Sequence, residues 1–238
     1  WEWHYLKRQC HTELATHTGH DGPVHTVAWS PDAQLIASAG SGNTVVIVRD
    51  AATGNTRWQL PAKEVGEVSR LLFTPSNQLI ITTKQVMLTL REAGSGKLVK
   101  TVLQNAQPIA DATLSPNGQL LAIAAGNWLY LYDLVNTTLL WSKEVRPGDL
   151  LTIALHPSQP LLATGDTNGN LILWKNKDGE ISKTIPTYHG VVRSLAFSPH
   201  GQELASSGDD KMIRLWHPTT GEARQTLAGH TEKVRKVV

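Results

Sequence analysis

The sequence predicts an all-β propeller built from four-stranded antiparallel blades. A proline turn followed by an apolar segment recurs five times, and successive copies are 41 to 44 residues apart, at Pro31, Pro75, Pro116, Pro157 and Pro199. A second turn signal keeps the same phase in the later half of each copy, at Thr53-Gly54, Ser95-Gly96, Asn136-Thr137, Asp178-Gly179 and Thr220-Gly221. A period of about 40–45 residues made of short β-type segments is typical of a propeller array.

One copy, residues 191–230, illustrates the four strands expected in each blade. The segment VVRSLAF is rich in β-branched and aromatic residues, and the turn SPHG follows it. ELASSG and MIRLW are the next two strands, joined by the DDK hairpin, and ARQTLAG after the turn PTTG is the outer strand. A single sheet of this size cannot cover both of its faces, so neighbouring copies must stack on it.

The same markers divide the chain into a short leader and a repeat array. Residues 1–10 are expected to form a linker helix because Trp3, Leu6 and Cys10 lie at helical spacing, although Trp1, Trp3 and Tyr5 also alternate as in a strand. Residues 11–238 are expected to form the propeller. Its repeats are placed at 19–64, 65–104, 105–145, 146–187 and 188–230, with the start of another at 231–238. Five complete repeats between partial ends suggest a piece of a longer parent, for which we expect seven blades.

The composition narrows the function classes. The formal charge of +2 comes from 22 basic and 20 acidic residues, which disfavours a nucleic-acid surface. The single cysteine, Cys10, excludes an internal disulfide framework and a cysteine-based zinc site. The sequence has no run of 18 apolar residues, so membrane insertion by this chain is not expected.

Polar side chains recur at matching places in several copies. Gly-His pairs stand at Gly19-His20 and Gly229-His230, and an Asp lies in the last hairpin at Asp210. The second strands carry the hydroxyl residues Ser38, Thr164 and Ser206, and the third strands end in Trp174 and Trp216. This pattern resembles the WD-repeat family, over roughly residues 11–238.

The resemblance implies a buried hydrogen-bond chain in each blade, from indole to hydroxyl, imidazole and carboxylate. No copy carries the full set: Arg49 stands at the tryptophan position of the first copy, and Tyr188 at the histidine position of the fifth. We therefore expect several blades to hold their hairpins by packing alone.

The opening residues carry a second resemblance. WEWHYLKR followed by Cys10-His11, directly before a propeller, is similar to the junction in planctomycete-type bacterial serine/threonine protein kinases, where a kinase domain precedes a WD-repeat region. This resemblance implies a sensor or docking tail whose catalytic domain lies upstream of Trp1.

Catalytic, metal and cofactor sites are not expected in this chain. Several histidines cluster early, but their spacing is unlike a chelating set. The GSGK segment at Gly94–Lys97 lacks the remaining residues of a phosphate loop and aligns with the turns of other copies. A propeller hydrolase remains an alternative that would need two carboxylates paired across a cleft.

The leading hypothesis is a non-catalytic scaffold that binds a protein or peptide. We expect a monomeric domain, with the partner held at the end formed by the connections between blades and between the second and third strands. The residues expected on this face are His25, Arg146, Thr167, Tyr188, His189, Arg193, Asp209 and Lys211. Trp58 and Trp141, on outer strands, are interpreted as packing between blade rims, with an exposed partner anchor as the alternative.

Overall fold

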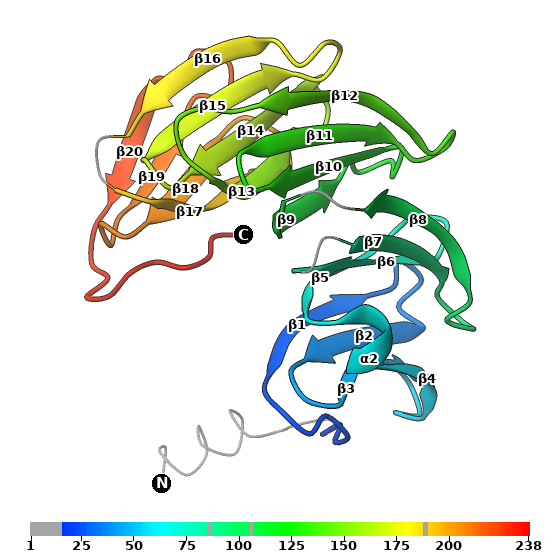
Figure 1. Ribbon diagram of the computed structural model, residues 1–238. Coiled ribbons are helices and arrows are strands. Elements are labelled where there is room, and N and C mark those ends of the chain that lie inside the picture. The colour runs from blue at the N-terminus through cyan, green and yellow to red at the C-terminus, as the bar shows by residue number, and fades with distance from the viewer. Residues whose placement is uncertain (1–15, 85–86, 105–106, 188–189) are drawn as a thin grey trace, which may run out of the picture.

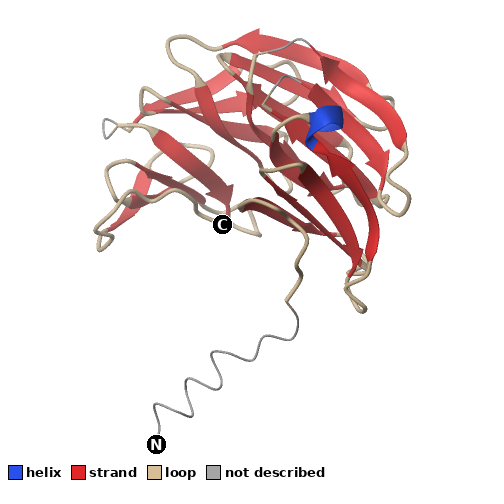
Figure 2. Cartoon of the chain, turned by 60° about the horizontal axis from the view of Figure 1, so that its bottom comes forward, coloured by secondary structure: helices blue, strands red, loops and turns tan. Residues whose placement is uncertain are grey.

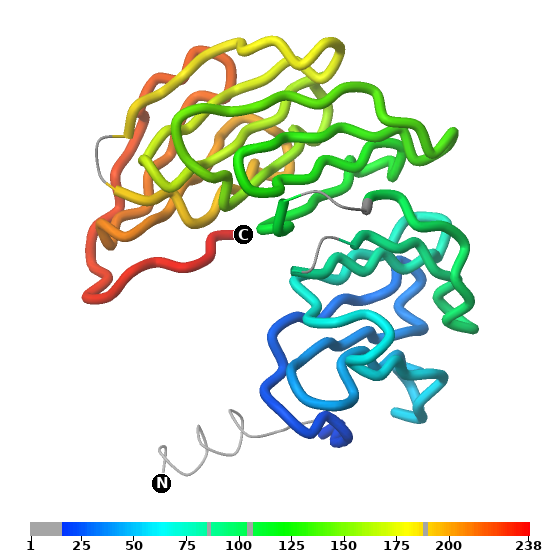
Figure 3. Tube along the Cα trace, in the orientation of Figure 1, coloured from blue at the N-terminus to red at the C-terminus, as the bar shows by residue number. Residues whose placement is uncertain are grey.

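The computed structural model describes residues 16–84, 87–104, 107–187 and 190–238, and it contains five separate antiparallel sheets of four strands each. Figure 1 shows these sheets following one another around a common centre in an open arc. The colour gradient of Figure 3 runs along that arc in chain order. The predicted all-β propeller architecture is confirmed.

Each sheet lies inside one of the expected repeats and runs from an inner to an outer strand. The first holds β1 (Val24–Trp29), β2 (Leu35–Gly40), β3 (Thr44–Asp50) and β4 (Thr56–Pro61). The second holds β5 (Val68–Phe73), β6 (Gln78–Thr83), β7 (Met87–Glu92) and β8 (Leu98–Gln104). The third holds β9 (Ile109–Leu114), β10 (Leu120–Ala125), β11 (Trp128–Asp133) and β12 (Thr138–Glu144). The fourth holds β13 (Leu150–Leu155), β14 (Leu161–Asp166), β15 (Asn170–Lys175) and β16 (Ile181–Pro186). The fifth holds β17 (Val192–Phe197), β18 (Leu204–Gly208), β19 (Ile213–Trp216) and β20 (Ala223–Leu227). We call these sheets blades 1 to 5.

One short helix interrupts the strands. Helix α2 (Ala62–Val65) connects blade 1 to blade 2, and Figure 2 shows it as the single helix among the described residues. Gly66 ends it at φ 69°, a conformation that costs glycine least. No helix among the described residues is long and apolar enough to cross a membrane. The linker helix expected at residues 1–10 lies outside the described residues.

The hydrophobic core lies between the blades. Four clusters of buried side chains each draw on two consecutive sheets, so every internal blade is covered on both faces. The outward flank of blade 1 differs. Val24, Val27 and Trp29 are exposed there, whereas Val192 and Leu195, at the matching positions of blade 5, are buried against blade 4.

Outer-strand tryptophans join neighbouring blades at the rim. The Trp58 indole N–H donates to the Ala93 carbonyl of blade 2 over 2.7 Å, and that of Trp141 donates to the Asn176 carbonyl of blade 4 over 2.8 Å. A Cβ added to Gly179 would lie 2.9 Å from the Trp141 ring, so this turn glycine makes room for the indole. Both tryptophans therefore pack against the rim of the next blade.

Residues 231–238, expected to start another repeat, contact the inner strand and hairpin of blade 5. The Val234 N–H donates to the Gly208 carbonyl of blade 5, and the Val237 N–H donates to the Ser194 hydroxyl. Residues 231–238 form no strand, however, and Val238 is fully exposed. One reason is that no further strand among the described residues pairs with this segment.

Candidate interaction face

The connections between blades and the hairpins between second and third strands lie at the same end of the propeller, because the strands of each sheet alternate in direction. The structure places six of the predicted residues there: His25, Arg146, Thr167, Arg193, Asp209 and Lys211. Tyr188 and His189 lie outside the described residues. We call this end the connection face.

Charged side chains of blade 5 converge on one carboxylate. Arg193 at the start of β17 forms an ion pair with Asp209, which also accepts a hydrogen bond from Lys233 over 2.8 Å. These hydrogen bonds, first that of Arg193 and then that of Lys233, hold the pKa of Asp209 well below its usual range. Lys233 was missed by the sequence analysis because it lies in the segment after blade 5, whose path the repeat pattern did not define.

The other predicted residues of the connection face make separate local contacts. The Arg146 guanidinium pairs with Glu144 at 2.6 Å and is largely exposed. The Thr167 hydroxyl accepts the Asp149 N–H over 3.1 Å. Lys211 is exposed at φ 68°, an uncommon conformation for a side chain of this size. The structure therefore brings Arg193 and Asp209 together and leaves Arg146 and Thr167 in other blades.

A cleft opens on the same end over blades 1 to 3. His25, Ser69 and Ala110 occupy matching positions on three successive inner strands and line a cleft of about 430 Å³. Its remaining walls come from Glu67, Val68, Lys84, Pro108 and Ile109. Of these residues, only His25 was predicted from the sequence. The repeat spacing could have found Ser69 and Ala110, because both stand six residues before a turn proline.

An ion pair stands at one edge of this cleft. Lys84 follows β6 and pairs with Glu67, which precedes β5. The apolar side chains of Val68 and Ile109 are buried below it. The exposed Pro108 and Ala110 give the cleft an apolar wall beside both signs of charge, an arrangement suited to a peptide side chain and its neighbouring backbone.

The polar side chains expected inside the blades form pairs. In blade 4 the Trp174 indole N–H donates to the Thr164 hydroxyl over 2.9 Å, and in blade 5 that of Trp216 donates to Ser206 over 2.8 Å. In blade 1 the Ser38 hydroxyl and His20 Nε2 are 2.7 Å apart. His20 Nδ1 donates to the Thr44 carbonyl, so both ring nitrogens have a partner in blade 1.

Where a blade lacks one of the polar residues of the WD-repeat pattern, another residue fills the position. Arg49, at the tryptophan position of blade 1, donates to the Thr18 carbonyl. In blade 3 the matching positions hold Ile123 and Tyr132, which are buried in an apolar cluster. His230 makes no hydrogen bond to any described residue.

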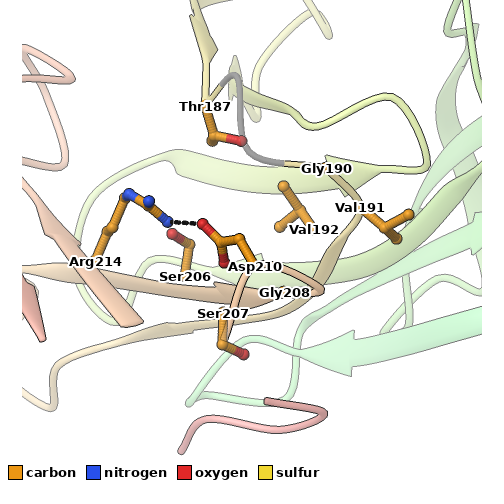
Figure 4. A pocket seen from close by; sticks show the side chains of 9 residues that line it. All are labelled: Thr187, Gly190, Val191, Val192, Ser206, Ser207, Gly208, Asp210 and Arg214. Atoms are coloured by element: carbon orange, nitrogen blue, oxygen red, sulfur yellow. Dashed lines mark hydrogen bonds and ion pairs between the residues drawn. The ribbon is translucent and has the colours of Figure 1, made fainter. Parts of the chain in front are cut away.

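Blade 5 ends in a small cavity beneath its hairpin. Figure 4 shows Asp210 and Arg214 joined across it, with Thr187 and Ser206 in the wall. Asp210 also accepts the Met212 N–H. The partner that we see for the Asp210 carboxylate is therefore Arg214, which the resemblance did not imply.

The inner strands also enclose a cleft at the propeller centre. Asp111 on β9 is buried there, pairs with Arg70 at 2.8 Å and accepts the Ile153 N–H from the next blade over 3.1 Å. Burial raises the pKa of Asp111, and Arg70 opposes that effect. Asp111 is the only acidic side chain among the described residues lining this cleft, so it offers no pair of carboxylates for hydrolysis. No metal-ligating group of three or more side chains occurs among the described residues.

Comparison with known families agrees with the repeat structure. The family model described as WD domain, G-beta repeat matches residues 11–48, 144–175 and 179–217. These segments cover parts of blades 1, 3, 4 and 5, including both tryptophan–hydroxyl pairs. Proteins with WD repeats act as protein-interaction scaffolds, and their WD domains are generally non-catalytic.

Similar proteins come from animals and a cyanobacterium. Telomerase protein component 1 of Rattus norvegicus is 28% identical over 80% of this chain and 7% of its own length. Serine-threonine kinase receptor-associated protein of Gallus gallus is 22% identical over 88% of this chain and 59% of its own. A WD repeat-containing protein of Synechocystis is 31% identical over 55% of this chain and 38% of its own. The chain thus spans less than two thirds of the length of each of these relatives. The three matched segments and these relatives show that the chain is similar to WD-repeat proteins, and its repeated four-stranded sheets agree with that similarity.

Proposed function

We propose that the chain is a non-catalytic scaffold that holds a peptide segment of a partner protein on its connection face. The observation that carries the proposal is the cleft over blades 1 to 3, where His25, Ser69 and Ala110 from three successive inner strands meet. Rigid strands that present irregular connections are the usual arrangement of a recognition surface.

The chemistry of the cleft indicates the kind of segment that fits. Pro108 and Ala110 are exposed and can contact one apolar side chain, while the exposed Glu67–Lys84 pair presents both signs of charge beside them. The exposed Lys211 and the Arg193–Asp209–Lys233 cluster provide further polar contacts over blade 5. The partner is therefore a peptide with an apolar anchor flanked by polar residues.

Selection from a displayed library of random peptides tests this proposal. We expect enriched peptides to lose about tenfold or more in affinity when His25→Glu or Ser69→Arg fills the cleft. Arg224→Glu is the matched control, because Arg224 is an exposed cation at the start of β20, at the opposite end of the propeller. If the affinity of the peptides is unchanged in both cleft variants, or falls equally with the control, this face is not the binding site.

A second candidate is the docking tail of a bacterial serine/threonine kinase. Its support is the resemblance of the opening residues, which lie outside the described residues. Reading the gene upstream for a glycine-rich loop and a catalytic loop tests it, and an upstream region without these motifs would rule it out.

A further inference from the structure

Residues 231–238 continue a hydrogen-bond pattern that links the inner strands of neighbouring blades. At the third position of β9, β13 and β17, a polar side chain accepts a backbone N–H from the segment that follows one repeat later. The three pairs are Asp111 with Ile153 at 3.1 Å, Thr152 with Leu195 at 3.1 Å, and Ser194 with Val237 at 3.2 Å. Val237 therefore holds the position beside blade 5 that Leu195 holds beside blade 4.

The rest of this segment is placed like an inner strand as well. Val234 is buried, as Leu150 and Val192 are at the first positions of β13 and β17. Its N–H donates to the Gly208 carbonyl of blade 5. Figure 1 shows the segment returning from blade 5 to the centre of the arc. We call residues 234–238 the acceptor segment, because no strand among the described residues pairs with them.

Blade 5 presents an apolar flank on the side of the acceptor segment. In blade 4, the side chains that face the next blade are buried in one cluster with it, and they are Ala163, Leu171, Leu173 and Ile185. The strand registers match them with Ala205, Ile213, Leu215 and Leu227 of blade 5. These four residues, which we call the blade 5 flank, are partly exposed, and Leu227 is 40% exposed. Because their matches in blade 4 pack as one cluster, the four form one surface.

The interface between blades 4 and 5 indicates what fits this flank. A second copy of the chain would have to bring β1 to the inner position, which the acceptor segment already fills. The flank therefore fits the second, third and fourth strands of a sheet. In blade 5 those strands carry Leu204 and Trp216 toward blade 4. A Cβ added to Gly221, in the turn before β20, would lie 2.6 Å from Ile185, so this turn also packs on blade 4.

We propose that the acceptor segment and the blade 5 flank together bind a partner chain that supplies three antiparallel strands and so completes a further sheet. The partner's first strand pairs with the acceptor segment, and backbone hydrogen bonds supply affinity in this mode. Its leucine and its aromatic side chain, at the positions of Leu204 and Trp216, cover the blade 5 flank and supply selectivity. This surface is separate from the cleft of the connection face, and the proposal goes beyond the function proposed for that cleft.

A labelled peptide tests the proposal on the intact chain. The probe is a fluorescein-labelled peptide with the sequence of residues 203–228, which contains the three strands and the glycine turn, and its binding is followed by fluorescence polarisation. We expect saturable binding that weakens about tenfold or more with Leu227→Glu in the chain. Leu139→Glu is the matched control, since Leu139 is a leucine of similar exposure on the outer strand of blade 3. A probe carrying Leu204→Glu and Trp216→Glu should bind at least tenfold more weakly.

Strand pairing makes a further requirement that a merely apolar surface does not. Successive N–H groups of an extended strand point to opposite sides, and that of Val237 points to Ser194, so that of Lys236 points toward the added strand. Lys236→Pro removes this donor and should weaken binding about tenfold, whereas Lys236→Ala keeps it and should not.

The proposal is overturned if the probe does not bind saturably, if the proline and alanine variants bind it alike, or if the substituted probe binds as well as the unmodified one. An equal effect of Leu139→Glu and Leu227→Glu would also overturn it. So would sedimentation of the chain alone as a dimer that Leu227→Glu dissociates, because the occupant of the flank would then be a second copy.

Discussion

The tryptophan–hydroxyl pair of blade 4 permits a quantitative test of how the blades are held. Trp174 and Thr164 are both buried, and one hydrogen bond of 2.9 Å joins them. Thr164→Val keeps the shape but leaves the indole N–H without a partner, which costs about 1–3 kcal/mol for a buried donor. Trp174→Phe leaves the hydroxyl without its donor and also removes ring volume, so its cost should be at least as large.

The double variant should cost less than the sum of the two single changes. Once both polar groups are gone, neither is left unsatisfied, and we expect a coupling free energy of about 1–2 kcal/mol, within the range for residues in contact. Urea unfolding followed by far-UV circular dichroism gives the three free energies. Single changes that add within about 0.5 kcal/mol would refute the reasoning, because that is the behaviour of independent sites. The pair Trp216 and Ser206 of blade 5 should repeat the result.

Three further predictions follow from the turns and charges. Ala33→Gly should raise the free energy of unfolding by about 1 kcal/mol in urea titrations, because Ala33 lies at φ 55°, a conformation that favours glycine. The matching positions of two other copies hold Gly118 and Gly201. A lower free energy of unfolding in the variant would contradict this reasoning. Gly179→Ala should destabilise the fold, since Gly179 lies at φ 67° and its added Cβ would meet Trp141. It should cost more than Gly229→Ala, which also lies at positive φ (140°) but has no atom within 4 Å of the added Cβ; equal urea midpoints would count against rim packing. The pKa of Asp209 is lower in the folded chain than in the unfolded chain, so the ionised carboxylate stabilises the fold. This contribution to the free energy of unfolding is present above the unfolded pKa and is lost as the pH falls through the lower folded pKa. Asp209→Asn should therefore remove this loss of stability at acid pH. Near neutral pH it should also speed hydrogen exchange at the Val234 amide, because Lys233 loses its ion pair. Unchanged exchange would show that the segment after blade 5 does not need the Lys233–Asp209 pair to stay in place.

Much of the fold could be predicted because it depends on local signals. The proline and glycine turns locate the ends of strands, and alternation of apolar residues marks the strands themselves, as β17 to β20 show against the segments expected for them. Helix α2 was missed, since four residues are too few for helical periodicity to show. The expectation of packing without a polar chain agrees with blade 3, where Ile123 stands at the hydroxyl position.

The contacts between charged side chains, at the candidate site and at the propeller centre, were harder to predict because they join segments from different parts of the chain. Arg70 and Asp111 lie on different inner strands, and only the packing angle between blades 2 and 3 brings their charges within 2.8 Å. Lys233 reaches Asp209 by a similar route from the segment after blade 5. Such pairs leave no periodic trace in the sequence.

The sequence by itself determined that this protein is an array of four-stranded sheets, because turn residues and side-chain alternation act over a few neighbouring positions. The tertiary structure alone decided which side chains of different copies meet, which apolar residues are left exposed on the flank of blade 5, and where a cleft opens over blades 1 to 3. Those outcomes depend on the distance and tilt between sheets, which are set by the packing of whole core clusters and by no single segment.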